Sequence, residues 1–119
     1  MVRTLIVLGA LSGFLGVALS AMARHATGAA YLQTVAQFLF FHAPAFLSLA
    51  ALLGTGLVHE RTGTLAGVAL LLGLALFCGD LAARDFLSRP LFPWAAPTGG
   101  FALMAGWLLI LVAALLRRG

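Results

Sequence analysis

The chain has 119 residues, of which 63% are hydrophobic and only 8% are charged, and its mean hydropathy is +1.13. Soluble domains carry about 25% charged residues, so the composition excludes a water-soluble globular protein. The net charge of +4 comes from arginines at the ends of apolar runs, which is typical of membrane topology and argues against nucleic-acid binding. Because a spanning helix uses about 20 residues, we predict an all-α polytopic membrane protein. It is expected to be a four-transmembrane-helix bundle, with residues 1–119 forming a single transmembrane domain.

The first half of the chain contains two predicted spans separated by a polar connection. Residues 4–22 form the first apolar run and residues 35–58 form the second. The first run is long for the apolar part of a signal peptide, so a span is favoured over a cleaved leader. On this run Gly9, Gly13 and Gly16 recur at short spacings that let another helix approach closely. We expect this face to pack inside the bundle, and the alternative is a homo-oligomer that forms through it.

The second half of the chain again contains two apolar runs. Residues 59–63 predict a tight polar turn, and residues 64–83 and 97–116 predict the third and fourth spans. The fourth span opens with a proline, which suits a first helical turn. Between these spans, residues 84–96 hold three aromatic residues and two prolines. We expect this short segment before the last helix to lie along the membrane interface.

An even number of spans places both termini on the same side of the membrane. That side carries four arginines and the other side carries three: Arg3, Arg61, Arg117 and Arg118 against Arg24, Arg84 and Arg89. The excess is small, and by the positive-inside rule it favours cytoplasmic termini.

Polar residues gather on the side opposite the termini, where spans one and three end and spans two and four begin. A ligand or proton site is predicted there from six residues: His25, His42, Asp80, Arg24, Arg84 and Thr98. At 1.5 Å per residue, His42 lies roughly 10 Å below the start of its span, and Asp80 about one turn inside the end of its own. An unpaired charge in hydrocarbon costs several kcal/mol, so such residues often mark function. The structural alternatives are that His42 bonds a carbonyl of a neighbouring helix, and that Asp80 pairs with Arg84 on its own helix face.

No pattern in the sequence identifies a reaction. The H-x-x-E, H-x-x-H and C-x-x-C spacings of metal sites are missing, and Cys78 and Asp80 are two residues apart, on different faces of a helix. His25 and His42 differ in depth by more than one turn, which disfavours a bis-histidine haem. Neither the serines nor the cysteine has a base placed beside it. We therefore expect no catalytic residue, no metal ion and no cofactor.

Five short motifs follow one another along nearly the whole chain. They are GALSGF at residues 9–14, SAMARH at residues 20–25, the pair Phe41-His42, FCGD at residues 77–80, and APTGG at residues 96–100 followed by Gly106-Trp107. In this order and spacing, the chain resembles the small bacterial inner-membrane family of the YgdD type, a domain of unknown function. The resemblance implies four transmembrane helices and a place in the bacterial inner (plasma) membrane. It implies no activity.

The chain departs from the family pattern at four positions. Ser20 and Ala23 stand where the pattern has glycine, Arg24 stands for an alanine, and Asp80 stands for a serine. An arginine and an aspartate have thus been added to the same side of the protein. We predict that Arg24 and Asp80 compensate each other as a pair.

The leading functional hypothesis is a small non-enzymatic membrane protein, an accessory or assembly factor for a larger membrane complex. It rests on the small size, the missing catalytic spacings and the small-residue packing faces. The alternative is a small transporter or proton-linked permease with a polar site around His42 and Asp80. A third hypothesis is a lipid- or quinone-binding protein that uses Phe86, Phe92 and Trp94 at the interface. A water-accessible cavity reaching His42 and Asp80 would favour transport, whereas dry packing with both residues hydrogen-bonded would favour a structural role.

Overall fold

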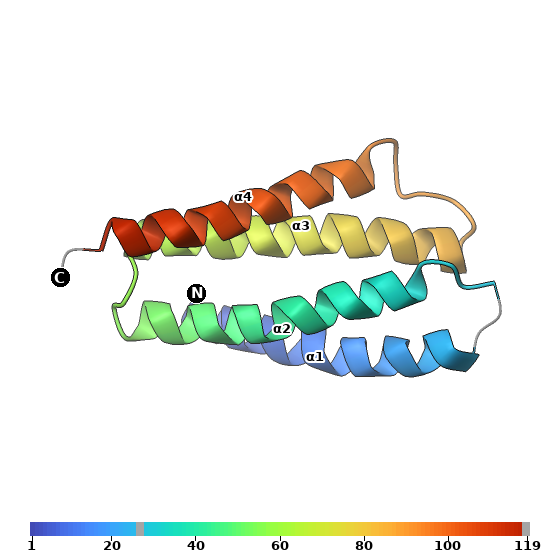
Figure 1. Cartoon of the computed structure of the whole chain (residues 1–119), viewed down its shortest axis with the longest axis horizontal. Helices are drawn as coiled ribbons and strands as arrows, with labels where there is room; N and C mark the ends of the chain where they lie inside the picture. The colour runs from blue at the N-terminus through green and yellow to red at the C-terminus, as the bar shows by residue number, and fades with distance from the viewer. Residues whose placement is uncertain (26–27, 118–119) are drawn as a thin grey trace.

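The computed structural model describes residues 1–25 and 28–117 (Figure 1). Its four α-helices are α1 (Val2–His25), α2 (Leu32–Gly54), α3 (Glu60–Phe86) and α4 (Ala95–Leu115). The described residues contain no strand. Each helix is long and apolar enough to cross a membrane. The prediction of an all-α protein with four spans is therefore confirmed.

The helices form two hairpins that lie side by side (Figure 1). In this arrangement α1 packs against α2, α4 packs against α3, and the hairpins meet where α2 contacts α3. The molecule measures 52 × 27 × 17 Å. The four-helix bundle is therefore flattened, and its buried core lies mainly between the two central helices.

The two ends of the molecule differ in what they carry. The start of α1 and the end of α4 lie toward the same end of the molecule as the α2–α3 turn (Figure 1), as an even number of spans requires, and we call this the terminal end. At the opposite end, which we call the loop end, α1 and α3 stop and α2 and α4 begin.

Glycines bring the helices of the first hairpin close together. A Cβ atom on Gly9 would lie 2.8 Å from Cγ of Leu47, and one on Gly16 would lie 3.0 Å from the ring of Phe40. Gly13 also faces α2, at an ordinary contact distance. The close packing predicted from these small residues is thus made within the chain, as expected. Because α2 covers this face, a homo-oligomer would have to use another surface.

The second hairpin has a still closer crossing, between Gly73 of α3 and Gly99 of α4. A Cβ atom on Gly99 would lie 2.5 Å from the amide nitrogen of Phe77 and 2.8 Å from the carbonyl oxygen of Gly73. Further along α4, a Cβ atom on Gly106 would lie 2.7 Å from a methyl group of Leu70. At this crossing the two backbones touch directly, as they do in small-residue contacts between membrane helices.

The turn between α2 and α3 comes earlier than predicted. The helix α2 ends at Gly54, not near residue 58, and Gly56 follows with a φ of +73°, which glycine adopts at little steric cost. Residues 59–63, predicted as the turn, instead start α3. There His59 is the N-cap, and its Nδ1 accepts a hydrogen bond from the backbone N–H of Thr62 at 3.3 Å. The polar composition marked a capped helix start, because capping residues and turn residues share the same side-chain chemistry.

The connection between α3 and α4 is also shorter than predicted. The helix α3 runs three residues past the predicted end of its span, and α4 starts at Ala95, two residues before Pro97. A proline in a first turn lacks an N–H that would be unbonded anyway. Residues 87–94, which we call the connecting segment, are not helical. Ser88 and Trp94 take left-handed φ values of +57° and +70° there, at a cost of about 1–2 kcal/mol each.

Candidate functional site

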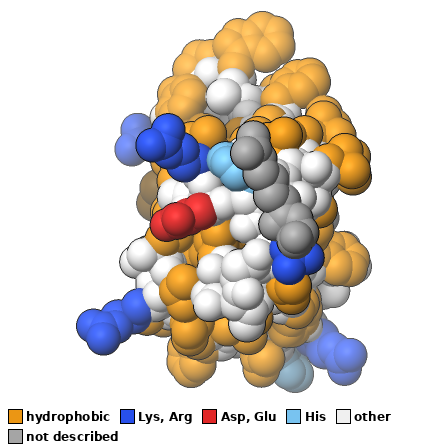
Figure 2. Space-filling model, turned by 90° about the vertical axis from the view of Figure 1, so that its left-hand side faces the viewer, with side chains coloured by type: hydrophobic (Ala, Val, Ile, Leu, Met, Phe, Trp, Pro, Cys, Tyr) orange, Lys and Arg blue, Asp and Glu red, His pale blue; other side chains and the backbone are white. Residues whose placement is uncertain are grey.

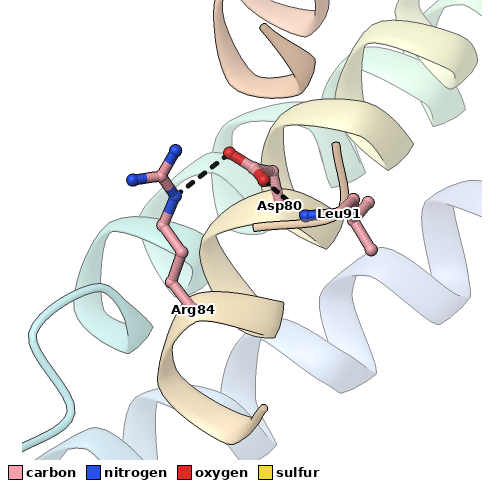
Figure 3. A network of polar contacts seen from close by, with 3 residues as sticks. All are labelled: Asp80, Arg84 and Leu91. Atoms are coloured by element: carbon pink, nitrogen blue, oxygen red, sulfur yellow. Dashed lines mark hydrogen bonds and ion pairs between the residues drawn. The ribbon is translucent and has the colours of Figure 1, made fainter. Parts of the chain in front are cut away.

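Asp80 is fully buried near the loop end of α3, and both of its carboxylate oxygens are used (Figure 3). Arg84, one turn later on the same helix, donates from Nε to Oδ2 at 3.2 Å, and the backbone N–H of Leu91 donates to Oδ1 at 2.9 Å. The carboxylate thereby holds the connecting segment against α3. These contacts match the structural alternative, in which Asp80 and Arg84 form an ion pair on one helix face.

A second aspartate joins the two hairpins at the loop end. The backbone N–H of Tyr31, the N-cap residue of α2, donates to Oδ2 of Asp85 at 2.8 Å. No acidic residue lies in the first turn of α2 and no side chain of its own caps it, so a carboxylate from α3 meets the positive end of the helix dipole. The guanidinium carbon of Arg84 lies 6.0 Å from the centre of the Tyr31 ring. This contact was not predicted from the sequence.

His42 is buried in the middle of the protein, and both of its ring nitrogens are occupied. Its Nδ1 lies 2.8 Å from the backbone carbonyl oxygen of Phe38, and Nε2 lies 3.2 Å from Nε1 of Trp107 on α4. An indole N–H can only donate, so Nε2 accepts and Nδ1–H donates, and the imidazole is neutral. The expected carbonyl thus belongs to the same helix, one turn earlier. The partner on the neighbouring helix is Trp107, which was not predicted from the sequence.

His42 and Asp80 do not share a site. Phe38 and Phe77 pack with their ring centres 4.3 Å apart, and they lie one turn from His42 and three residues from Asp80 along the antiparallel helices. At 1.5 Å per residue the two polar groups are therefore separated by roughly 10 Å along the membrane normal. The described residues contain no buried side-chain nitrogen or oxygen without a hydrogen-bond partner.

The other residues of the predicted site lie apart from these contacts. Arg24, His25 and Thr98 are exposed at the loop end. Arg24 and His25 form the last turn of α1, where positive charge is favourable for the helix dipole. Among residues 1–25 and 28–117, the ion pair of Asp80 is made with Arg84, so the predicted pairing of Arg24 with Asp80 is wrong.

A pocket opens between α2 and α4 beside the His42–Trp107 contact. Its volume is about 330 Å³, and its wall is almost entirely apolar: Phe41, Pro44, Ala45, Ser48, Leu49, Leu52, Trp107 and Ile110. No Asp, Glu, Lys or Arg is part of this wall. Where the chain is described, no three His, Cys, Asp or Glu side chains gather as metal ligands do.

At the terminal end the charged side chains that the structure describes are spread out and do not form a cluster. Figure 2 looks onto this end and shows basic side chains at separate places around it. Nε of Arg117 donates to the carbonyl oxygen of Gly56 at 3.2 Å, and the backbone N–H of His59 donates to the carbonyl oxygen of Ala113 at 2.9 Å. Both contacts tie the α2–α3 turn to the end of α4.

These features define a small polytopic α-helical membrane protein whose buried polar groups serve contacts between its own elements. Comparison with known sequences also identifies the family to which the chain belongs. The chain belongs to a family described as a protein of unknown function (DUF423), whose model matches residues 14–100, which confirms the resemblance drawn from the motifs.

Relatives in three bacteria match along most of the chain. The UPF0382 inner membrane protein YgdD of Escherichia coli strain K12 is 32% identical over 124 aligned residues, which cover 95% of this chain and 90% of the relative. A UPF0382 membrane protein of Haemophilus influenzae is 32% identical, covering 83% of each chain. The UPF0382 membrane protein YwdK of Bacillus subtilis is 31% identical, covering 94% of this chain and 96% of the relative. No solved structure matches.

Proposed function

We propose that the protein is a non-enzymatic accessory or assembly factor that packs against a larger membrane complex. One observation carries this proposal: the ionisable groups buried in its spans, His42 and Asp80, are both bound by protein groups of the same chain. A side chain that holds helices or segments together is not free to take up and pass on a proton or an ion.

The same observation argues against the alternative, a proton-linked permease. A proton relay through the membrane needs ionisable groups within reach of one another or of water. Here the Phe38–Phe77 pair packs between His42 and Asp80. A proton-flux assay in proteoliposomes tests this point: wild type and His42→Ala are expected to give the same background flux. A flux in wild type that is lost in His42→Ala would favour transport and contradict the accessory role.

The outer helices offer the surfaces for a partner. Only 22% of the residues in the apolar windows of α1 and α4 are buried. On α1 the exposed residues Ala10, Phe14, Val17 and Ala21 form a stripe on the side away from α2, and small residues in such a stripe favour helix contacts in lipid. The protein extracted with its native lipids should therefore carry a stoichiometric membrane partner.

A bulky residue in the correct surface should release that partner. Ala10→Trp tests the outer face of α1, and Ala105→Trp tests that of α4, because both alanines are exposed. One of the two substitutions is expected to remove the partner while the other serves as its matched control. A chain that is always isolated with lipid alone would refute the proposal.

We further propose that the termini face the cytoplasm of the bacterial inner membrane. The support is the arginine excess at the terminal end and the names of the relatives as inner membrane proteins. Single cysteines at Leu57, in the α2–α3 turn, and at Leu87, in the connecting segment, provide the test, because both residues are exposed and the native Cys78 is buried. A membrane-impermeant maleimide applied to cells with a permeabilised outer membrane should label Leu87→Cys and spare Leu57→Cys. The reverse pattern would invert the topology.

A further inference from the structure

We propose that the pocket between α2 and α4 binds a neutral, lipid-soluble ring that carries hydrogen-bonding oxygens, of the isoprenoid quinone class. This inference goes beyond the accessory role and does not depend on it. The pocket is apolar with few polar groups, and its volume of about 330 Å³ is at the lower end of small-molecule sites. It has room for a ring, and because the pocket is open to the membrane, the ring's tail can extend into lipid.

The depth of the pocket in the membrane indicates whether its ligand enters from the water or from the lipid. Pro44 and Ser48 lie 12 and 16 residues after the start of α2, and Trp107 lies 12 residues after the start of α4. At 1.5 Å per residue they are roughly 18–24 Å from the loop end, well inside a hydrocarbon core of about 30 Å. No charged side chain lines the pocket. A ligand that reaches it therefore comes through the lipid and is neutral.

The wall of this pocket holds a polar side chain, Ser48, whose hydrogen-bond partner an acyl chain cannot supply. The hydroxyl of Ser48 makes no hydrogen bond in the described part of the chain. Polar groups left unpaired in hydrocarbon are costly. A quinone carbonyl can accept a hydrogen bond from the Ser48 hydroxyl.

The aromatic wall suits a flat ring. Phe41 and Trp107 are 67% and 46% exposed although they border the pocket, so their faces remain available for stacking. The indole of Trp107 is fixed by its hydrogen bond to His42 at 3.2 Å. The buried histidine thereby holds one wall of the pocket in place before a ligand arrives, which is how binding sites lower the cost of ordering.

Trp107 can report directly on this pocket. The chain has two tryptophans, so Trp94→Phe leaves Trp107 as the only one. In nanodiscs of this variant, decylubiquinone is expected to quench the Trp107 fluorescence saturably, above the linear quenching that comes from quinone dissolved in the lipid. Decylbenzene, which has the same tail and no ring oxygens, should not displace it at tenfold excess.

Three substitutions separate binding in the pocket from general partition into the lipid. Ala45→Phe fills the pocket and should abolish the saturable part, whereas Ala105→Phe, on the lipid-facing side of α4, should leave it unchanged. Ser48→Ala removes one hydrogen bond without changing the packing, and should raise the half-saturation concentration about fivefold. The emission of Trp107 without ligand should stay the same in Ser48→Ala, which shows that the wall is intact.

Three results would overturn the proposal. Purely linear quenching in the Trp94→Phe protein would show that the ring has no site. Saturable quenching that survives Ala45→Phe would place the site elsewhere. Saturable quenching by phospholipids with brominated acyl chains, displaced by decylbenzene, would show that an ordinary acyl chain occupies the pocket.

Discussion

Replacing Gly99 by alanine tests how the second hairpin is held together. The added Cβ atom would lie 2.5 Å from the Phe77 amide nitrogen and 2.8 Å from the Gly73 carbonyl oxygen, whereas ordinary contacts are about 3.5–4.0 Å. Since both neighbours are backbone atoms of α3, neither can rotate away, and the helices must separate by about 1 Å. Overpacking of this kind costs about 1–3 kcal/mol. We expect about 2–3 kcal/mol here, which is roughly a 30- to 140-fold change in the unfolding equilibrium.

The neighbouring glycine supplies a matched control. A Cβ atom on Gly100 would have no heavy atom within 4 Å, so Gly100→Ala should not destabilise the protein, and the better helix propensity of alanine acts in its favour. Reversible unfolding by sodium dodecyl sulfate, followed by tryptophan fluorescence and circular dichroism, measures both variants. If Gly99→Ala and Gly100→Ala unfold at the same detergent fraction, the backbone contact between α3 and α4 does not hold the hairpin, and the reasoning from this crossing fails.

The remaining predictions use the same unfolding assay. His42→Ala and Trp107→Phe should each destabilise the protein, and the double variant should recover a coupling of about 0.5–1.5 kcal/mol; losses that simply add would mean that the indole–imidazole hydrogen bond contributes nothing. Asp80→Ala should cost about 2 kcal/mol, because the Leu91 N–H loses its acceptor together with the half-exposed ion pair. Arg24→Ala should cost less than about 0.5 kcal/mol, and an equal loss in both variants would restore the pairing of Arg24 with Asp80.

The features that depend on composition could be predicted from the sequence. Four spans follow from the apolar runs and from the length of helix that a bilayer requires. The packing of Gly9 and Gly16 against α2 follows from their spacing, which repeats once per two turns on one helix face. The Asp80–Arg84 pair also follows from spacing, since residues four apart on a helix are neighbours. Each of these predictions needs only the geometry of a single helix.

The contacts between helices could not be predicted in the same way. Whether Trp107 reaches His42 depends on the rotation and relative height of α4 and α2, and neither is encoded in the period of one helix. Asp85 meets the backbone of Tyr31 only because α3 runs past the end of its apolar stretch. For this reason the structure does not bring together all the polar residues that were predicted to share one site at the loop end. The sequence indicates on which side of the membrane and at what depth each residue lies, but not in which direction it points around its helix axis.

The contact between the two hairpins adds hydrogen bonds to the close packing that also holds each hairpin together. In lipid, burial of apolar surface gives helices little reason to associate, so close packing and hydrogen bonds must act instead. Within each hairpin the helices meet through glycines, at Gly9 and Gly16 in one and at Gly73 and Gly99 in the other.

Between the hairpins, Gly63 and Gly67 of α3 also allow close packing, against Leu53 of α2 and Leu5 of α1, and hydrogen bonds are added to it. The bonds from Trp107 to His42, from Tyr31 to Asp85, and from Cys78 to the Val35 carbonyl all connect the first hairpin to the second. A glycine contact depends on shape alone and tolerates no added atom, whereas a hydrogen bond fixes the height at which two helices meet. The buried histidine therefore has a structural task that a larger apolar residue could not perform: it sets the register of α4 against α2, and with it the shape of the pocket between them.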